Sequence, residues 1–299
     1  MDIKPLDKYC FSKNYRDSKM NRDKITVYIP THNRVDLLKR ACESVINQSY
    51  TNLELIVVDD GSSDDTWSYL KNLKKSDERV LIFRNEISKG ACVSRNIAID
   101  HATGKYITGL DDDDYFALSR LDNFYSSRDN LNQYSFLSSS VIPICDKNIL
   151  RNELYNSKRE LLLSELSNGN NVGNQVFTLT KRLKTIKAFD ANLNCWQDYD
   201  LWIRLCCKYG NGLNLSNADY YLDVDPKRER ITNSPRKING MNFFIDKHYN
   251  LLSQSFKSRY KAYIYVYGGI RKQGKCDLLF LFFSVAYGVK KYANLAYKH

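Results

Sequence analysis

Between residues 24 and 110 the sequence alternates between short apolar runs and segments whose apolar residues recur with the period of an α-helix. The apolar runs, each followed by polar or turn-forming residues, are 25–29, 53–58, 80–83 and 106–110. Four residues spaced i, i+3, i+4 and i+7 predict one helix face, namely Leu38, Ala41, Cys42 and Val45. Further helices are predicted over 64–73 and 92–101. Such alternation favours a mostly parallel sheet flanked by helices, whose ligands bind beyond the carboxyl ends of the strands.

The rest of the chain differs from this part in composition. Residues 1–23 are polar and show no apolar periodicity, which predicts a loose N-terminal arm. Residues 116–225 have a mixed character, with Asn-rich loops and one amphipathic helix that begins near Asp198. Residues 226–299 are basic. We therefore expect four segments, 1–23, 24–115, 116–225 and 226–299.

Length and cysteine usage limit the class of protein. A chain of 299 residues with 43% hydrophobic residues is long enough for one large domain or two small ones with a real core. The eight cysteines include no Cys-x-x-Cys pair and most lie in apolar periodic stretches, so we expect reduced core thiols rather than disulfides or a zinc site. Since the N-terminal residues have no apolar signal-like stretch, we expect a cytosolic protein.

The net charge of +11 arises in the C-terminal quarter. Residues 227–299 carry 15 Lys and Arg against three acidic residues, a local charge of +12, whereas the remaining residues sum to −1. Such an imbalance predicts a polyanionic partner for this quarter alone. Nucleic acid is disfavoured as that partner, because the rest of the chain is slightly acidic and carries no recognised nucleic-acid motif.

The apolar stretch 278–289, which precedes Lys290 and Lys291, suggests what that partner is. Its 12 residues would span about 18 Å as a helix, short of the roughly 30 Å core of a bilayer. No run of 18 apolar residues occurs, so a conventional transmembrane helix is not expected. One interpretation is an interfacial segment on anionic lipid, and the other is a buried helix of the soluble domain. The sequence leaves both open.

Four consecutive aspartates, Asp111 to Asp114, follow the last of the apolar runs. Adjacent carboxylates repel one another, so a cation is expected beside them, and a Mg²⁺ or Mn²⁺ ion that also holds a diphosphate is the usual choice. A calcium-binding loop is excluded because Phe116 stands where that loop requires Gly. A solvated acidic turn remains the simple alternative.

A second acidic turn, Asp59-Asp60-Gly61-Ser62, follows the apolar run 53–58. By itself it reads as an ordinary strand-ending turn in which Gly supplies a positive φ. Because it is predicted at the same edge of the sheet as the aspartate cluster, we expect the two to share a nucleotide site.

Five motifs in order give the chain a resemblance to a known family. They are VYIPTHNR (27–34), LIVVDDGSSDDT (55–66), KGACVSRN (89–96), GKYITGLDDDD (104–114), and FD (189–190) followed by QDYDLWIR (197–204). Together they resemble the inverting family 2 glycosyltransferases, which have the GT-A nucleotide-sugar-binding fold. The resemblance implies that 24–115 binds the nucleotide sugar and that 116–225 binds the acceptor and holds the catalytic residue. The segment 226–299 would be a helical basic extension, which associates with the membrane in the first of the two interpretations given above.

The same resemblance implies roles for individual residues. Thr31, His32 and Asp60 would surround the nucleotide base, where a carboxylate can accept the imide N–H. Arg95 would lie near the base or the diphosphate. The aspartate cluster would contribute Asp111 and Asp112 at the ribose or the hydrated metal site, and Asp113 as ligand of Mn²⁺ or Mg²⁺. The metal would offset charge on the departing nucleoside diphosphate.

Asp198 matches the catalytic base of the family, although Gln197 stands where the family has Glu. An acceptor hydroxyl has a pKa far above 7, so a carboxylate must accept its proton as the new bond forms. Asp198 could also serve only as an N-cap of its helix. Asp200 is the second choice for the base.

The resemblance also implies an activity. Processive synthases would add a Gln-x-x-Arg-Trp motif, but none of Trp67, Trp196 and Trp202 follows an Arg, so transfer of one sugar is expected. The expected enzyme moves a hexosyl or N-acetylhexosaminyl group from a UDP-sugar to a glycan hydroxyl with inversion. Its acceptor would be a lipid-diphosphate-linked O-antigen or capsule intermediate at the inner face of the cytoplasmic membrane. The alternatives are a metal-dependent sugar nucleotidyltransferase and a catalytically silent carbohydrate-binding subunit.

Overall fold

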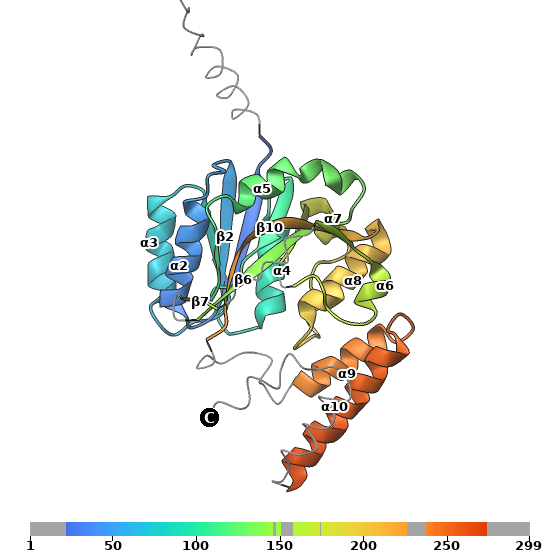
Figure 1. The fold of residues 1–299 in the computed structure, drawn as a ribbon. Coiled ribbons are helices and arrows are strands. Elements are labelled where there is room, and N and C mark those ends of the chain that lie inside the picture. Colours follow the sequence, from blue (N-terminus) through green and yellow to red (C-terminus); the bar gives the residue numbers. More distant parts are fainter. Residues whose placement is uncertain (1–21, 146–147, 151–157, 174, 226–236, 274–299) are drawn as a thin grey trace, which may run out of the picture. The chain divides into compact units, whose positions relative to one another are not determined.

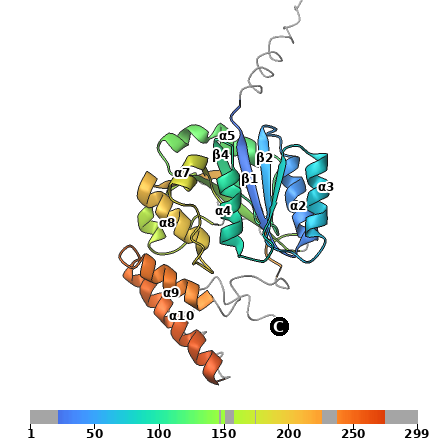
Figure 2. The same ribbon diagram turned by 180° about the vertical axis from the view of Figure 1, so that it is seen from behind.

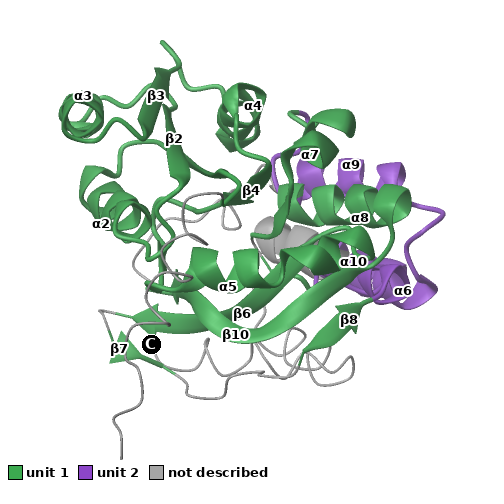
Figure 3. Ribbon diagram, turned by 90° about the horizontal axis from the view of Figure 1, so that it is seen from above, with its two compact units in different colours: residues 1–161, 172–191, 197–228 green, residues 162–171, 192–196, 229–299 purple. Residues whose placement is uncertain are grey.

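The computed structural model describes residues 22–145, 148–150, 158–173, 175–225 and 237–273. These residues form two compact units, which Figure 3 shows in different colours. Unit 1 comprises 1–161, 172–191 and 197–228, and unit 2 comprises 162–171, 192–196 and 229–299. The N-terminal arm before residue 22 and the apolar stretch 278–289 lie outside the described residues, so their predicted roles stay predictions.

Unit 1 is built on one sheet, whose first half is parallel as predicted (Figure 1). This half has the order β3-β2-β1-β4 and consists of β1 (Ile25–Thr31), β2 (Leu53–Asp59), β3 (Val80–Arg84) and β4 (Tyr106–Gly109). All three of its pairings are parallel. The carboxyl ends of β1, β2 and β4 therefore meet at one edge, as the alternating pattern required.

The second half of the sheet adds antiparallel pairs to the predicted parallel arrangement. Its strands are β5 (Tyr115–Phe116), β6 (Leu137–Cys145), β7 (Asn148–Ile149), β8 (Arg159–Leu161), β9 (Phe177–Leu179) and β10 (Gly212–Asp223). The strand β9 runs antiparallel to both β4 and β6, whereas β10 is parallel to β6. A parallel connection needs a crossover of a dozen or more residues, and the short link between β6 and β7 permits only an antiparallel pair.

Helices cover both faces of the parallel half. In Figure 3, α2 (Val35–Ile46) and α3 (Thr66–Ser76) lie on one side of β2 and β3, and α4 (Ala91–His101) lies on the other. The predicted face of α2 is confirmed, since Leu38, Ala41, Cys42 and Val45 are all buried. The strands β1 and β2 are buried on both faces, which explains why they read as nearly continuous apolar runs.

The remaining helices of unit 1 are short except for one. They are α5 (Arg120–Ser126), the 3₁₀ helix η1 (Arg128–Asn132), α7 (Thr180–Thr185) and the longer α8 (Gln197–Tyr209). The helix α8 begins one residue before Asp198, where the sequence predicted an amphipathic helix, and its buried residues include Leu201, Trp202 and Leu205. Figure 2 shows α7 and α8 from the side of α4.

Unit 2 is helical in its described part. It contains α6 (Leu163–Leu166), α9 (Lys237–Lys247) and α10 (Gln254–Gln273), so the predicted helical extension is present in the described residues. Its aromatic centre is Trp196, whose ring lies 5.2 Å from that of Phe244, 5.8 Å from Phe256 and 6.1 Å from Tyr260. Among the described residues no helix is long and apolar enough to cross a membrane.

Cysteine chemistry agrees with the sequence in the described residues. Among the described cysteines, none forms a disulfide; they are Cys42, Cys92, Cys145, Cys195, Cys206 and Cys207. Four of these six are buried in the core, at 42, 92, 195 and 206. Burial raises the pKa of the Cys42 thiol to about 12, so it is an inert core group rather than a nucleophile.

A buried arginine connects α5 with β10. Arg120 is 1% exposed, with its guanidinium 4.7 Å from the ring of Phe116 and 4.6 Å from the ring of Phe124. It forms an ion pair with buried Asp219 and donates to the Ser139 hydroxyl at 2.6 Å. The pair neutralises two charges in the core.

Arg120→Met is expected to lower the free energy of unfolding by about 3–5 kcal/mol, because it leaves Asp219 charged, buried and without its cation. Urea unfolding followed by circular dichroism measures the loss. The double variant Arg120→Met with Asp219→Leu removes both charges and should recover part of the stability. A single variant within 1 kcal/mol of the wild type would contradict this account of the pair.

Candidate active site

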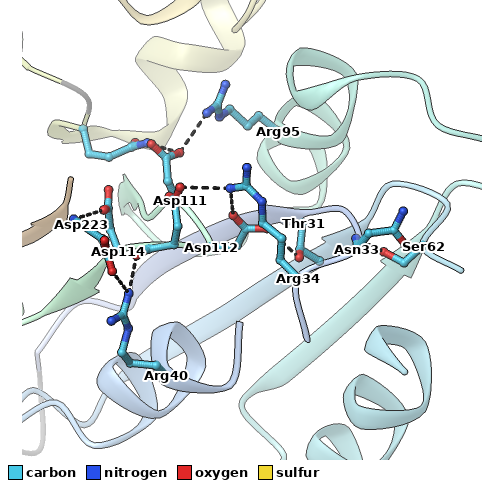
Figure 4. A network of polar contacts seen from close by, with 12 residues as sticks. Thr31, Asn33, Arg34, Arg40, Ser62, Arg95, Asp111, Asp112, Asp114 and Asp223 are labelled. Carbon is cyan, nitrogen blue, oxygen red and sulfur yellow. Dashed lines mark hydrogen bonds and ion pairs between the residues drawn. The ribbon is translucent and has the colours of Figure 1, made fainter. Parts of the chain in front are cut away.

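Polar residues gather where β1, β2 and β4 end, as Figure 4 shows. The loop after β1 begins with buried Thr31, whose hydroxyl donates to Asp112 Oδ2 at 2.8 Å. Asn33, which has a positive φ of 53°, donates its backbone N–H to the Ser62 hydroxyl at 2.8 Å. These bonds join the turn after β2 and the aspartate cluster after β4 to the same loop, so the predicted shared edge is formed.

Arginine side chains supply cations for the aspartate cluster. Arg34 Nη1 lies 3.1 Å from Asp112 Oδ1 and 3.0 Å from Asp113 Oδ2, so one nitrogen bridges the two carboxylates (Figure 4). Arg40 Nη2 donates to the backbone carbonyl of Asp113 at 2.5 Å and to Asp223 Oδ2 at 2.9 Å. Burial raises the pKa of Asp112 to about 6, Arg34 opposes that rise, and the charge of Asp113 adds to it.

The fourth aspartate of the cluster points into the protein. Asp114 Oδ2 accepts from the Tyr220 hydroxyl at 2.6 Å, and its Oδ1 accepts from the backbone N–H of Asp223 at 2.8 Å. Burial raises the pKa of Asp114 well above its ordinary value, and the charges of Asp111 and Asp113 reinforce the rise. Asp114 therefore fastens the cluster to β10 and contributes to structure rather than to ligand binding.

Asp111 belongs to a separate network on the side of α8. Its Oδ1 accepts from Arg95 Nη2 at 2.9 Å and from Gln175 Nε2 at 3.1 Å. Arg95, only 5% exposed, also donates through Nη1 to Gln197 Oε1 at 2.9 Å. Its guanidinium lies 5.1 Å from the ring centroid of Phe189. Arg95 thus connects the end of β4 to the first turn of α8.

Asp198 lies beside this network with an unsatisfied oxygen. Its Oδ1 is buried and has no hydrogen-bond partner among the described residues. Burial raises the pKa of Asp198 to about 7, the positive charge of Arg95 lowers it, and the charge of Asp111 raises it again. A carboxylate with an open lone pair and a pKa near neutrality can accept a proton at physiological pH.

Asp200, the second choice for a base, has a different environment. It is fully buried, and its Oδ2 accepts from Arg204 Nε at 2.8 Å. Arg204 also donates to the carbonyl oxygens of Ile186 and Ala188, at 2.8 and 2.5 Å. Asp200 therefore fixes the loop before α8, and this placement favours Asp198 over Asp200 as the base.

The turn after β2 is held by Asp60, whose carboxylate accepts four hydrogen bonds. Two come from the side chains of Asn85 and Ser88, both at 2.7 Å, and two from the backbone N–H groups of Lys89 and Gly90, at 2.9 and 2.8 Å. Burial alone would raise the pKa of Asp60, but these four donors lower it overall. In this structure Asp60 therefore holds the loop 85–90, a role that the sequence did not suggest.

Gly61 allows the backbone of this turn, and His32 lies exposed beside it. Gly61 has a φ of 73°, and a Cβ there would lie 2.8 Å from the backbone nitrogen of Ser88, so no other residue fits easily. The exposed His32 has its Nδ1 2.8 Å from the carbonyl oxygen of Asp60. Because a carbonyl oxygen only accepts, Nδ1 carries the proton and Nε2 is the acceptor nitrogen, 3.1 Å from Asn33 Nδ2.

Sequence reasoning missed several residues of these networks. The sequence motifs include Arg34 but give it no role, and no sequence pattern distinguishes Arg40, Gln175 and Tyr220. A basic residue directly after a strand that ends level with an acidic cluster could have indicated Arg34. Gly109, a glycine within a strand, indicates that another group approaches the backbone closely there. That group is Gln175, because a Cβ at Gly109 would lie 2.0 Å from Gln175 Oε1.

The aspartate cluster offers carboxylate oxygens of the kind that a divalent cation binds. Within the described ranges no three His, Cys, Asp or Glu side chains are placed to hold a metal ion together. Mg²⁺ is commonly held by one or two carboxylates and by the phosphates of its substrate, so such a cluster is not required. The Asp113 side chain is 22% exposed and that of Asp112 9%. These hard oxygen ligands fit a cation shared with a diphosphate, provided that Arg34 releases Asp113.

Sequence comparisons identify relatives over most of this chain. The family model described as glycosyl transferase family 2 matches residues 26–184. A putative colanic acid biosynthesis glycosyl transferase, WcaA of Escherichia coli strain K12, is 35% identical over 247 residues, which cover 79% of this chain and 85% of the relative. The UDP-Glc:alpha-D-GlcNAc-diphosphoundecaprenol beta-1,3-glucosyltransferase WfaP of Escherichia coli is 27% identical, covering 67% of this chain and 77% of that protein.

Solved structures show the same fold. The Staphylococcus aureus TarS fragment 1-349, in complex with UDP-GlcNAc, matches with a TM-score of 0.64 at 19% identity and covers 85% of this chain and 77% of that one. The mannosyltransferase PcManGT from Pyrobaculum calidifontis, in complex with GDP-Man and Mn²⁺, matches with a TM-score of 0.52 at 19% identity, covering 70% and 59%. The predicted GT-A fold is confirmed.

Proposed function

Because the chain belongs to glycosyl transferase family 2, we propose that it moves one sugar from a UDP-sugar to a hydroxyl of a glycan acceptor with inversion at the anomeric carbon. The observation that carries the proposal is Asp198, a carboxylate with an unpartnered buried oxygen and a pKa of about 7. It stands at the start of α8, one residue after the Gln197 side chain that Arg95 binds. Arg95 also binds Asp111, which follows β4 at the polar edge of the sheet.

The proposed chemistry is a single displacement. The acceptor hydroxyl attacks the anomeric carbon, Asp198 takes its proton, and the bond to the nucleoside diphosphate breaks on the opposite side of the carbon. One displacement inverts the configuration, so an α-linked donor yields a β-glycoside. Asp198 must be ionised for this step, which requires a pH above its pKa of about 7 in this structure.

The donor is proposed to be a UDP-sugar carrying a hexosyl or N-acetylhexosaminyl group. Support comes from the TarS structure with UDP-GlcNAc and from the UDP-Glc named for the Escherichia coli relative. Thr31, His32 and Asp60 would surround the base. Of the four groups that bond Asp60, the Ser88 hydroxyl is the one that can rotate away, which would release a lone pair of Oδ2 for the imide N–H.

Arg95 and the aspartate cluster would bind the ribose and the diphosphate of the donor. Asp111 and Asp112 would face the ribose, and Asp113 would ligate Mg²⁺ or Mn²⁺. When bound, the metal would supply Lewis-acid stabilisation of the departing diphosphate. Arg34, which bonds Asp113 in the structure and whose side chain is 32% exposed, has room to turn towards the phosphates.

A screen for nucleotide release tests the activity. Purified protein, Mn²⁺ or Mg²⁺, a panel of nucleotide sugars and a synthetic lipid-diphosphate-linked acceptor are incubated, and free UDP is measured. Acceptor-dependent release of UDP with a β-linked product supports the proposal. Release of pyrophosphate from UTP and a sugar phosphate would instead indicate a nucleotidyltransferase. Tight UDP binding without turnover of any donor would indicate a silent binding subunit.

The acceptor is proposed to be a lipid-diphosphate-linked O-antigen or capsule intermediate. The name of one relative contains diphosphoundecaprenol, and that of another refers to colanic acid biosynthesis. Such an acceptor would bring the enzyme to the inner face of the cytoplasmic membrane. The basic C-terminal quarter fits that location, and the described part of α10 already carries Lys257, Arg259 and Lys261, none of which is buried.

Removal of residues 276–299 is expected to release the enzyme from vesicles that contain anionic lipid. Each Lys or Arg near such a surface contributes about 1 kcal/mol, and the apolar stretch 278–289 would add a part that salt does not screen. Sedimentation with vesicles at low and high salt measures binding, and turnover of a short soluble acceptor is the control. A truncated chain that is insoluble or inactive towards that acceptor would show that the segment is a core helix.

A further inference from the structure

Two neutral amides hold the Arg95–Asp111 ion pair at its two ends. On one side, Gln175 Nε2 donates to Asp111 Oδ1 at 3.1 Å, and the Tyr28 hydroxyl donates to Gln175 Oε1 at 3.3 Å. On the other side, Gln197 Oε1 accepts from Arg95 Nη1 at 2.9 Å. The pair itself measures 2.9 Å. The result is a partly buried chain of hydrogen bonds in which only the two central groups carry charge.

The charges beside Asp198 are therefore few. The titratable groups that interact electrostatically with Asp198 are Tyr28 of β1, Cys92 and Arg95 of α4, and Asp111 after β4. Asp190 and Asp200 act on Cys92. Asp200 is already paired with Arg204. Arg95 is the cation that lowers the pKa of Asp198, and the same guanidinium forms an ion pair with Asp111. A second carboxylate on Arg95 would leave Asp198 with less of its field.

We propose that Gln197 is a positioning residue for the base, because its amide oxygen fixes Arg95 between Asp111 and α8 without adding a negative charge. The inference rests on the proposed function, since it gives Gln197 a part in setting the pH range over which Asp198 accepts a proton. Two observations carry it. Gln197 binds the same guanidinium that binds Asp111, and Arg95 is buried, so its orientation depends on these few partners.

The sign of the effect follows from the charges. A glutamate at 197 would still accept from Arg95 but would add a second carboxylate, beside that of Asp111, to one buried guanidinium. Arg95 stays charged, but the new carboxylate offsets part of its field at Asp198 and repels ionised Asp198 directly, so the pKa of Asp198 rises. The base is active only when ionised, so the acid limb of the pH profile moves to higher pH. For one like charge at such range the shift is about 1–2 pH units.

The test is the pH dependence of kcat/KM for Gln197→Glu, with Cys207→Glu as the matched control. Cys207 is an exposed residue of the same helix, so its substitution adds the same charge to α8 at a distance from Asp198. We expect the acid limb to rise by about 1–2 pH units in Gln197→Glu and to stay at the wild-type position in Cys207→Glu. Superimposable profiles for Gln197→Glu and the wild type would overturn the inference.

A second measurement separates this inference from the proposed function. The carboxyl carbon of Asp198 can be titrated by NMR on protein labelled with ¹³C-aspartate, with Asp198→Asn to assign the signal. This readout needs no turnover and also shows whether Gln197→Glu is folded. If no donor is turned over, the proposed function fails while the titration still decides the role of Gln197. An unchanged Asp198 titration in folded Gln197→Glu would refute that role even for an active enzyme.

Discussion

Asp198→Asn is expected to lower kcat by at least about 10²-fold while the affinity for UDP changes little. The substitution keeps the size of the side chain but removes the carboxylate that we propose takes the proton of the acceptor hydroxyl, and this proton would move only in the transition state. UDP binding, which we propose to occur at the strand ends, does not require that step. Steady-state rates of UDP release, together with calorimetric titration of UDP, measure both quantities on the same preparation.

Asp200→Asn is the matched control for this prediction. Asp200 is buried against Arg204, so its loss should lower stability through the loop that Arg204 holds, with a smaller effect on kcat of the folded enzyme. Thermal unfolding of both variants distinguishes the two kinds of damage. A kcat loss in Asp200→Asn that equals or exceeds the loss in Asp198→Asn, at full folding, would move the base to Asp200.

The pH profile of the wild type adds an independent expectation. Because the pKa of Asp198 is raised to about 7, the rate should fall as pH falls through that value, where the carboxylate becomes protonated. The same shift has a cost in stability. A carboxyl group with a pKa higher in the folded than in the unfolded state destabilises the protein above its unfolded pKa of about 4, and this cost disappears at lower pH.

The parallel half of the fold could be predicted because its information is local. A period of two in a strand or 3.6 in a helix is visible within a dozen residues, and α2 has the buried face that was expected. The antiparallel half could not be predicted in this way. Its β4–β9 pairing joins Tyr106 with Leu179, residues far apart in the chain that no local pattern relates.

The candidate site was predictable in position but not in detail. Residue types and strand ends indicated that Thr31 and Asp112 would lie close together, and the structure places them 2.8 Å apart. The partners of each charge depend on side-chain geometry that composition does not contain. Asp60 shows the difference, because the family resemblance implied a carboxylate that accepts from the base, whereas the folded loop gives that carboxylate four donors.

Excess EDTA is expected to stop turnover, and Asp113→Ala to abolish it with the fold retained. The sequence argument for a metal was that four adjacent carboxylates need a cation, and the structure weakens that argument, since Arg34 and Arg40 already donate hydrogen bonds to the cluster. A different argument remains. A departing nucleoside diphosphate would bring new negative charge close to the aspartate cluster, whose arginines already bind carboxylates. A hard cation with carboxylate and phosphate ligands would neutralise the charge of the cluster and that of the diphosphate.

The geometry makes this prediction sharp, because Arg34 and a metal would compete for Asp113. Arg34→Met should therefore bind Mn²⁺ more tightly than the wild type when no nucleotide is present, as measured by electron paramagnetic resonance of free Mn²⁺. Asp114→Asn is the control, because that aspartate binds Tyr220 and the backbone of β10, so its change should lower stability more than Mn²⁺ affinity. Full turnover of the purified wild type in excess EDTA would rule out the metal, and Arg34 would then remain the counter-ion of Asp113 throughout the reaction.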